Sequence, residues 1–396
     1  MPLTLLLDLD DTLLNTNLPA FVPAYFQALS KELAPHIPPD QMFRALLSGT
    51  RLMNESDDFS RTLNDVFDAD FYSRLNAARG ELDLAIQNFY DTIFPTLQGL
   101  TTPNPDAKPF IEWAFSQGFR IVIATDPLLP RKAAHHRLRW AGLAPEQFEF
   151  VTAYEDFHFS KTHPAYYAEI LGRLGWVEGP ILMVGNDIER DILPAKRLGL
   201  ATYHMDDNPA SPSGPEADSR GTLPDLRLWL ESTNLASLTP SFDTIDAVLG
   251  IMLSTPAVLN SLLRGMDAAF WSRKVSTDDW NMTELICHLR DTEREVHHLQ
   301  LKLFEERDEP FIPRPDTGVW ANQRDYLHED GAESLREFNQ ARRMTMDLLK
   351  SLSPNEWRRK ARHAIFGPTD FLEVVGFIAE HDRLHVQQAW SIVKKR

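Results

Sequence analysis

Residues 5–13 read Leu-Leu-Leu-Asp-Leu-Asp-Asp-Thr-Leu, an apolar run that delivers two acids, Asp8 and Asp10, separated by one residue. Alternate residues of an extended chain point to the same side, so both carboxylates are expected to face one site. A strand this apolar is typical of a parallel sheet covered by helices on both faces, where ligand sites lie beyond the carboxyl ends of the strands. Paired acids there cost solvation energy unless a cation or a reaction uses them, so this stretch predicts a functional site.

The composition sets limits on the class of protein. A chain of 396 residues allows two or three domains, each with its own core. The net charge of −17 argues against a general binder of nucleic acid or anionic membranes, while leaving room for a small phosphorylated ligand at a local cationic site. Cys287 is the single cysteine and cannot form an internal disulfide. No apolar run approaches the roughly 20 residues that span a bilayer, so we expect a cytoplasmic protein.

The first half of the chain alternates between strand and helix patterns. Strands are expected at residues 3–7, 120–124, 148–152, 181–184 and 200–204. This alternation predicts an α/β fold with a doubly wound parallel sheet. The segment between the first two strands, roughly residues 15–97, has helical periodicity and is too long for a simple crossover. It is therefore expected to be a helical insertion, or cap, over the ends of the strands.

The second half has a different pattern. Residues 206–222 are polar and rich in Pro, Gly and Ser, so no regular structure is expected there, and a short helix at 225–231 would close the first domain. Beyond Leu238 only helical periods are found, which predicts an all-α four-helix bundle from the segments 243–264, 282–306, 334–352 and 369–393. The predicted domains are residues 1–238 (core 1–14 and 99–238, cap about 15–98) and 239–396.

Polar residues follow each of the expected strands of the first half. Thr125 and Asp126 end the second strand, Lys161 opens a helix after the third, and the fourth is followed by Asn186, Asp187 and Asp191. Together with Asp8 and Asp10, these residues can converge at one end of the sheet. Hard oxygen ligands suit Mg²⁺, and a threonine and a lysine can hold phosphoryl oxygens.

This order of motifs closely resembles that of the haloacid dehalogenase-like phosphohydrolases with a helical cap, over about residues 1–232. The resemblance implies that Asp8 is the nucleophile that forms an aspartyl-phosphate and that Asp10 protonates the leaving group and then activates water. It implies that Asp8, Asp10 and the fourth loop hold Mg²⁺, and that Thr125, Asp126 and Lys161 bind phosphate. An acid at position 10 favours dephosphorylation over dehalogenation, because an alkoxide needs a proton on leaving. A cap of this size favours a small phosphorylated metabolite as the substrate.

The motifs depart from that family's usual pattern at three positions. Asp126 stands where the family usually has Asn, and its carboxylate would repel phosphate if it faced inward. Lys161 is followed by Thr162 instead of the frequent Pro. The fourth motif reads Gly185-Asn186-Asp187 where the family usually has Gly-Asp. Either Asn186 replaces the usual acid, or Asp187 takes its place with Asp191 four residues on.

The second half contains a group of histidines. His381 and His385 are four residues apart on an expected helix and share its apolar face, and His288 lies at the edge of another apolar stripe. Three imidazoles that converge inside a bundle suit Zn²⁺ or Ni²⁺. His297 and His298 lie away from the stripe of their helix and are expected to face solvent.

These histidines, with Trp280, Asp382 and Gln387, resemble the DinB-like (YfiT-like) bundle family over about residues 241–396. The resemblance implies a second divalent metal, held by His288, His381 and His385. Members of that family are divergent, and two alternatives remain for the bundle. It could be the main catalyst, as a metal-dependent hydrolase or thiol transferase, or a non-catalytic module that binds metal and assembles a homodimer.

Overall fold

The computed structural model describes residues 2–206, 217–274, 276 and 279–395. Contacts between residues divide the chain into two compact units. The first contains residues 1–166 and 178–241, and the second contains residues 167–177 and 242–396. This division differs from the predicted domains chiefly in one segment, since residues 167–177 group with the second unit.

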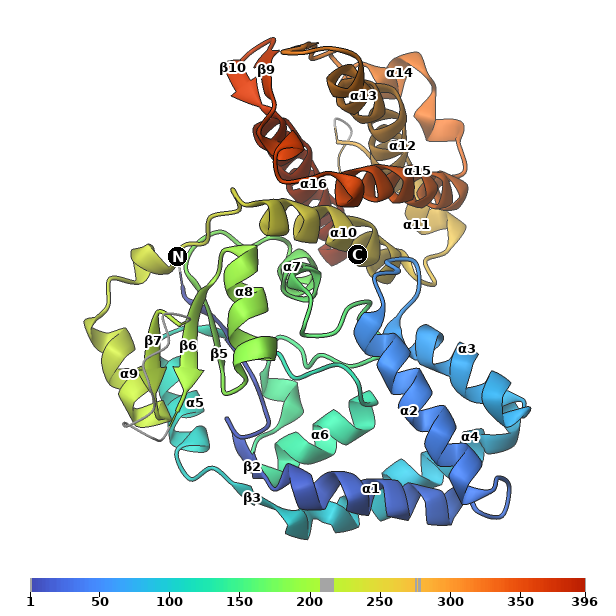
Figure 1. Cartoon of the computed structure of the whole chain (residues 1–396), viewed down its shortest axis with the longest axis vertical. Helices are drawn as coiled ribbons and strands as arrows, with labels where there is room; N and C mark the ends of the chain where they lie inside the picture. The colour runs from blue at the N-terminus through green and yellow to red at the C-terminus, as the bar shows by residue number, and fades with distance from the viewer. Residues whose placement is uncertain (1, 207–216, 275, 277–278, 396) are drawn as a thin grey trace. The chain divides into compact units, whose positions relative to one another are not determined.

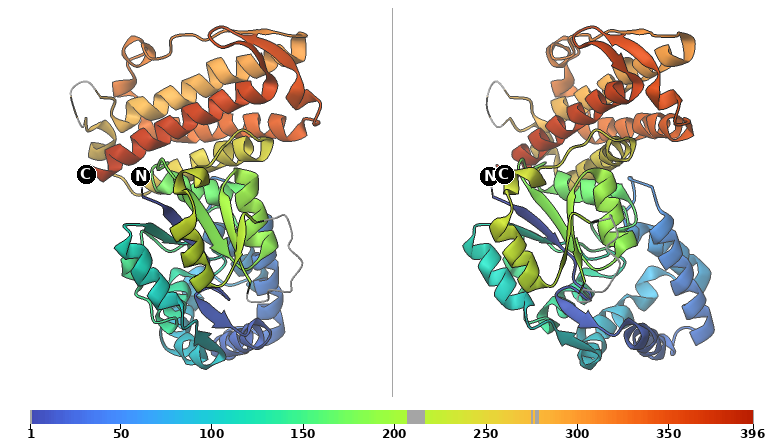
Figure 2. Two further views of the ribbon diagram at one scale, coloured as in Figure 1. Left: turned by 90° about the vertical axis from the view of Figure 1, so that its left-hand side faces the viewer. Right: turned by 60° about the vertical axis from the view of Figure 1, so that its left-hand side comes forward.

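The first unit is built on a parallel sheet whose five described strands lie in the order β4-β1-β5-β6-β7 (Figure 1). Their bounds are β1 Thr4–Leu7, β4 Arg120–Ile123, β5 Ile181–Gly185, β6 Ala201–Met205 and β7 Ser219–Gly221. Strand β1 pairs with β4 on one side and with β5 on the other. Figure 2 shows helices on both faces of this sheet. The predicted fold class, an α/β doubly wound parallel sheet, is therefore confirmed.

Two predictions about the strands were wrong. Residues 148–152 do not form a strand but lie beside β4 with a single bridge between Val151 and Ile123, supported by Thr152 N donating to Ile123 O at 3.0 Å. Strand β7 lies in the polar stretch where no regular structure was expected. Its three residues have no apolar alternation, so only their pairing with β6 makes them a strand. Residues 207–216 of that stretch lie outside the described residues.

Four α-helices occupy residues 18–88 of the segment between β1 and β4: α1 Leu18–Leu33, α2 Pro39–Glu55, α3 Leu63–Leu75 and α4 Arg79–Asn88 (blue in Figure 1). The chain enters and leaves this region through an antiparallel pair, β2 Leu14–Thr16 and β3 Thr101–Pro103. A capping box, in which Thr62 and Asp65 satisfy each other's backbone, begins α3. The predicted helical insertion is therefore present, and we call these helices the cap.

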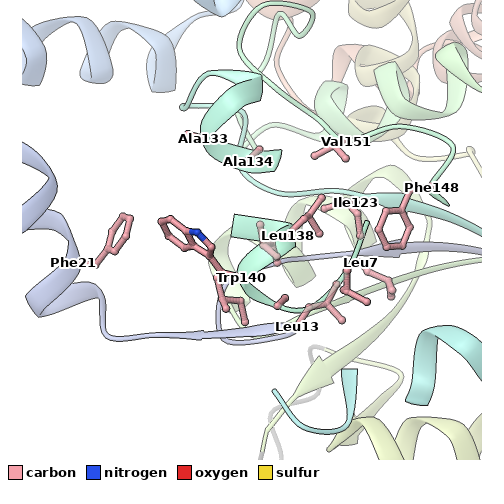
Figure 3. Packing of buried hydrophobic residues seen from close by; sticks show 14 of the residues in the cluster. Leu7, Leu13, Phe21, Ile123, Ala133, Ala134, Leu138, Trp140, Phe148 and Val151 are labelled. Carbon is pink, nitrogen blue, oxygen red and sulfur yellow. The ribbon is translucent and has the colours of Figure 1, made fainter. Parts of the chain in front are cut away.

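An aromatic contact joins the cap to the sheet region. Trp140 ends α6 (Arg131–Trp140), and its ring lies edge-on to Phe21 of α1 with centroids 6.3 Å apart. The same indole stacks on Phe94, which follows the cap helices, at 5.3 Å. Figure 3 shows the Phe21 and Trp140 rings facing each other, with Leu138 and Leu7 farther along the same core. The cap therefore shares one hydrophobic core with the sheet and α6.

The remaining helices of the first unit are α5 Ala107–Ser116, α7 Pro164–Arg173, α8 Leu193–Leu198 and α9 Leu223–Ser232. Residues 167–173 of α7 group with the second unit. Between β5 and α8 lies η4, a single π-helical turn at Ile188–Ile192.

The second unit is a bundle of long helices, α10 Ile245–Leu263, α12 Met282–Thr292, α15 Gly331–Ser351 and α16 Phe371–Lys394. A π-helical turn, η6 Glu293–His297, continues α12 into α13 His298–Glu306. The short helices α11 Ala268–Ser272 and α14 Trp320–Gln323 connect these elements. The predicted four-helix bundle is confirmed.

The expectation that this half holds only helices was wrong. A small sheet is formed by β8 Phe311–Ile312, β9 Lys360–His363 and β10 Gly367–Asp370. Strands β9 and β10 form a hairpin, and Gly367 with φ of +77° provides the left-handed backbone conformation at its turn. These strands are two to four residues long, too short to give a period in the sequence.

The prediction that no apolar run approaches the length needed to span a bilayer was also wrong. Helix α10 has 19 residues and is apolar enough to cross a membrane by length and composition alone. However, 67% of its most apolar window is buried inside the fold, against α15 and α16. The central helix of a packed bundle passes the same test.

The position of β1 inside the sheet predicts a large effect of truncating it. Leu6 is fully buried between Val122 and Met183, so Leu6→Ala should lower the free energy of unfolding by about 2–5 kcal/mol. Leu84→Ala is the matched control, because Leu84 is 79% exposed and its loss should change stability by less than about 0.5 kcal/mol. Urea unfolding followed by circular dichroism measures both, and equal effects would contradict the buried position of β1.

Candidate functional site

The loop after β1 places Asp8 and Asp10. The chain reverses just after Asp10, where Asp11 has a left-handed backbone with φ of +51°. Aspartate tolerates this conformation better than most residues, and its carboxylate accepts a hydrogen bond from Thr16 N at 2.8 Å. Asp8 remains at the carboxyl end of β1 with 5% of its surface exposed, and Thr12 Oγ1 lies 3.4 Å from its Oδ2.

Lys161 lies between two carboxylates at this edge of the sheet. Its Nζ donates to Asp8 Oδ1 at 2.5 Å and also forms an ion pair with Asp191. All three residues are at most 5% exposed. Burial opposes the charge on Lys161, but the two acids outweigh it and raise the pKa of the ammonium. The sequence placed Lys161 at the start of a helix, whereas the structure places it in a turn before α7.

The fourth motif contributes Asp191 to this group. Asp191 is buried in η4, and its Oδ2 accepts from Asp187 N at 3.0 Å. A side chain on Gly185 would lie 2.2 Å from that same oxygen, so only glycine leaves room for it. Burial raises the pKa of Asp191, although the charge of Lys161 counteracts this rise.

The two neighbouring candidates of the fourth motif lie differently. Asp187 caps the start of η4, because its Oδ1 accepts from Glu189 N at 2.9 Å and from Arg190 N at 3.1 Å. The backbone oxygen of Asn186 lies 3.0 Å from His204 Nε2. Of the three candidates, Asp191 is therefore the one whose carboxylate meets Lys161.

Asp10 has a partner that sequence reasoning missed. Its Oδ1 accepts from the hydroxyl of Thr16 at 2.6 Å and forms an ion pair with Arg137 of α6. Arg137 is only 5% exposed, and burial lowers the pKa of its guanidinium to about 10. Helix α6 carries several basic residues, and nothing in their spacing distinguishes Arg137 from the others.

The second motif lies beside Lys161. The backbone oxygen of Thr125 accepts from Thr152 Oγ1 at 2.5 Å and from the Tyr166 hydroxyl at 2.8 Å. Asp126 Oδ1 lies 3.4 Å from Lys161 N, and its other oxygen forms an ion pair with Arg190. Burial raises the pKa of Asp126, and the Arg190 charge opposes this rise. Arg190 therefore compensates the carboxylate that stands in the usual place of Asn.

The bundle histidines converge. Ligand atoms of His288, His381 and His385 all lie within 4.8 Å of one another. Nε2 of His288 is 3.1 Å from Nε2 of His381. The oxygen of Gln388 lies 3.1 Å from His385 Nδ1, and since an amide oxygen only accepts, this contact leaves His385 Nε2 free to bind a metal.

A buried ion network lies beside these histidines. Arg342 forms ion pairs with Glu293 and Asp382, and none of the three side chains has exposed surface. Burial opposes the Glu293 charge, but Arg342 and then His297 hold the pKa of this carboxyl well below its usual range. An unpaired charge here would be strongly destabilising, so the network fixes η6, α15 and α16 relative to one another.

The prediction that His297 and His298 face solvent was wrong. His297 is buried, its Nδ1 lies 2.9 Å from Glu293 Oε2, and its ring stands perpendicular to that of His381 at 5.5 Å. His298 Nε2 lies 2.9 Å from Thr345 Oγ1. The π-helical turn η6 is the reason, because its wider turn rotates these residues away from the positions that a regular α-helix gives them.

Comparisons with known proteins agree with both halves. The haloacid dehalogenase-like hydrolase family model matches residues 3–199, and the DinB superfamily model matches residues 252–389. The chain joins a haloacid dehalogenase-like hydrolase to a DinB superfamily domain.

Individual relatives are distant. A protein of Oceanobacillus iheyensis, provisionally named a metal-dependent hydrolase, is 29% identical over 118 residues, which cover 30% of this chain and 67% of the relative. The YfiT protein of Bacillus subtilis, described as a probable metal-dependent hydrolase, is 18% identical over 39% of this chain and 88% of its own, with a TM-score of 0.35. A HAD phosphatase from Thermococcus onnurineus is 24% identical over 58% of this chain and 98% of its own, with a TM-score of 0.39.

The donor sets of both regions fit metals. In the hydrolase region, two buried carboxylates share one ammonium, which leaves a negative charge that an oxygen-binding cation such as Mg²⁺ can offset. In the DinB region, two nitrogens bound to one tetrahedral Zn²⁺ would be about 3.3 Å apart, close to the 3.1 Å between His288 and His381.

The histidine cluster predicts a pH dependence of stability without metal. Burial lowers the pKa of His288 to about 3 and that of His381 well below its usual value. The unfolded chain binds these protons near pH 6.5, so stability is present above that pH and is lost as pH falls toward 3. Between pH 7.5 and 5, each such histidine should lower the free energy of unfolding by about 2 kcal/mol.

Urea unfolding in EDTA at both pH values measures this effect. The variant His288→Gln/His381→Gln should lose most of the pH dependence, and replacing the exposed His328 with Gln should leave it unchanged. An identical pH dependence in all three proteins would contradict the buried, neutral state of the cluster.

Proposed function

We propose that the first unit is a Mg²⁺-dependent phosphohydrolase that acts on a small phosphorylated metabolite through an aspartyl-phosphate on Asp8. The observation that supports this most directly is the position of Lys161 between Asp8 and Asp191, at the carboxyl edge of the sheet. This arrangement puts a nucleophilic oxygen next to a fixed positive charge, as a transferred phosphoryl group requires.

The charges at the site support the need for a cation. Asp8, Asp10 and Asp191 are negative and Lys161 and Arg137 are positive, so these five groups carry one net negative charge when all are ionised. A phosphate dianion would be repelled by that balance. Mg²⁺ would make the balance positive, and Asp8, Asp191 and the backbone oxygen of Asp10 are the groups proposed to hold it, with Asn186 and Asp187 nearby. When bound, the cation would supply charge compensation to the phosphoryl oxygens.

The protein side chains then have distinct roles. An Asp8 oxygen forms a bond to phosphorus as the bond from phosphorus to the leaving oxygen breaks. Lys161, with Thr125 and the backbone of Asp126, compensates the phosphoryl charge. Asp10 gives its proton to the leaving oxygen and later takes a proton from the water that attacks the aspartyl-phosphate, which releases phosphate and restores Asp8.

Replacing the nucleophile tests this proposal. Asp8→Asn should reduce Mg²⁺-dependent turnover of p-nitrophenyl phosphate by at least about a thousandfold, because an amide cannot form the covalent intermediate. Steady-state assays with circular dichroism as a folding check measure the effect. The control is Asp40→Asn on the cap surface, where Asp40 forms an exposed ion pair with Arg44, and this variant should keep full activity. Turnover that persists in Asp8→Asn would rule out the covalent mechanism.

For the DinB domain we propose a metal centre with His288, His381 and His385 as ligands. It is supported by the convergence of their ligand atoms and by the contact that orients His385. Zn²⁺ or Ni²⁺ fits an all-imidazole set with open positions for water or substrate. This centre has two alternative roles: it catalyses a reaction of its own, or it serves binding and homodimer assembly. Replacing its ligands distinguishes between them.

Metal analysis of the purified protein tests the centre. Mass spectrometry should find about one equivalent of Zn²⁺ or Ni²⁺ per chain, and His381→Gln/His385→Gln should lose it while phosphatase turnover is retained. His328→Gln changes an exposed histidine and should retain the metal. If the unmodified protein, with all three histidines, never holds a transition metal, the cluster has only a packing role.

A further inference from the structure

The cap encloses a cavity that the proposed reaction does not by itself explain. Its volume is about 470 Å³, and it lies among the helices α1 to α4 and the segment that follows β4. Cavities of this size are typical of sites for small organic molecules and far exceed the voids in packed protein interiors. Aromatic side chains form much of its wall, among them Phe21, Tyr25, Phe67, Phe71, Tyr90 and Tyr154.

Several polar groups of this wall already have partners. The hydroxyls of Tyr25 and Tyr90 hydrogen-bond to each other at 2.8 Å, and burial raises the pKa of Tyr25 to about 12, so it stays neutral. Lys132 binds Asp91 at 2.6 Å, and Arg79 binds Asp68 at 2.9 Å. A ligand rich in hydroxyls would therefore lose its bonds to water and find few replacements here.

Arg137 is the link between the cavity and the proposed nucleophile site. It lines the cavity, its guanidinium lies 5.1 Å from the centre of the Phe21 ring, and it forms the ion pair with Asp10. Within the described residues, its buried Nε has no hydrogen-bond acceptor. Arg137 therefore connects the cavity wall to Asp10, the side chain that the proposed function places at the leaving oxygen.

We propose that this cavity binds the leaving group, and that the substrate is the phosphomonoester of a bulky, apolar alcohol that contains a ring. This proposal rests on the proposed function only in placing the phosphate at Asp8. The aromatic wall removes the apolar part of the alcohol from water, and the ring packs against the aromatic side chains.

Turnover of matched phosphomonoesters tests the substrate class. 3-Phenylpropyl phosphate and propyl phosphate have leaving groups of similar basicity, so their kcat/KM ratio reports the cavity and not the chemistry. The ratio should be at least about tenfold in favour of the phenyl compound, and glycerol 1-phosphate should be no better than propyl phosphate.

A pair of variants localises the preference. Thr50→Trp on α2 fills the cavity and should bring the ratio to within about threefold of one. Thr92→Trp places the same ring at an exposed position just after α4, outside the cavity, and should keep the wild-type ratio. Ratios near one in the unmodified protein, or a preference that survives Thr50→Trp, would overturn the proposal.

A binding measurement separates this inference from the proposed function. Calorimetry of the Asp8→Asn protein with 3-phenylpropanol requires no turnover and should detect binding that Thr50→Trp abolishes. Binding without turnover of any phosphomonoester would support the cavity and contradict the phosphatase. Turnover of all the esters at equal rates, with no binding of the alcohol, would support the phosphatase and overturn the cavity proposal.

Discussion

A single buried ammonium organises the catalytic edge of the first unit. Lys161 lies before α7, Asp8 follows β1 and Asp191 lies in η4 after β5, so one cation connects three separate segments of the chain. Neither acid could be buried at this edge without it, because an uncompensated buried charge is strongly destabilising. Other details serve the same contact: Gly185 leaves space for Asp191, and Arg190 compensates Asp126 next to Lys161.

The bundle uses the same physical solution, with an arginine in place of the lysine. There, one fully buried guanidinium, Arg342, is shared by Glu293 and Asp382 from two other helices. Asp382 is the neighbour of His381, and Glu293 contacts His297, so the network also fixes the backbone that carries the histidines. Both candidate sites thus stand on a buried cation shared by two acids, which holds functional side chains more firmly than apolar packing alone.

The sequence was informative wherever a residue's role follows from its position in a regular element. Asp8 follows an apolar strand, and His381 and His385 share a helical face, so their meeting points could be predicted. Arg137 could not, because its contact with Asp10 spans 127 positions and no local pattern marks it. The small sheet of the bundle was missed because its strands are too short for a period, and His297 because a regular helical count fails across η6. Long-range pairs and irregular turns leave no local signal in one sequence.

The π-helical turn η6 has a further consequence for the bundle. Such a turn holds one residue more than the α-helix around it requires, so α12 and α13 are out of phase by roughly 100° relative to a continuous helix. Removing one residue from Glu293–His297 would give a straighter and more regular helix. However, it would also rotate the His297 imidazole out of the bundle interior and break the ion pair between Glu293 and Arg342. A regular helix and the buried contacts of Glu293 and His297 are therefore incompatible at this point of the chain, and the observed backbone keeps the buried contacts.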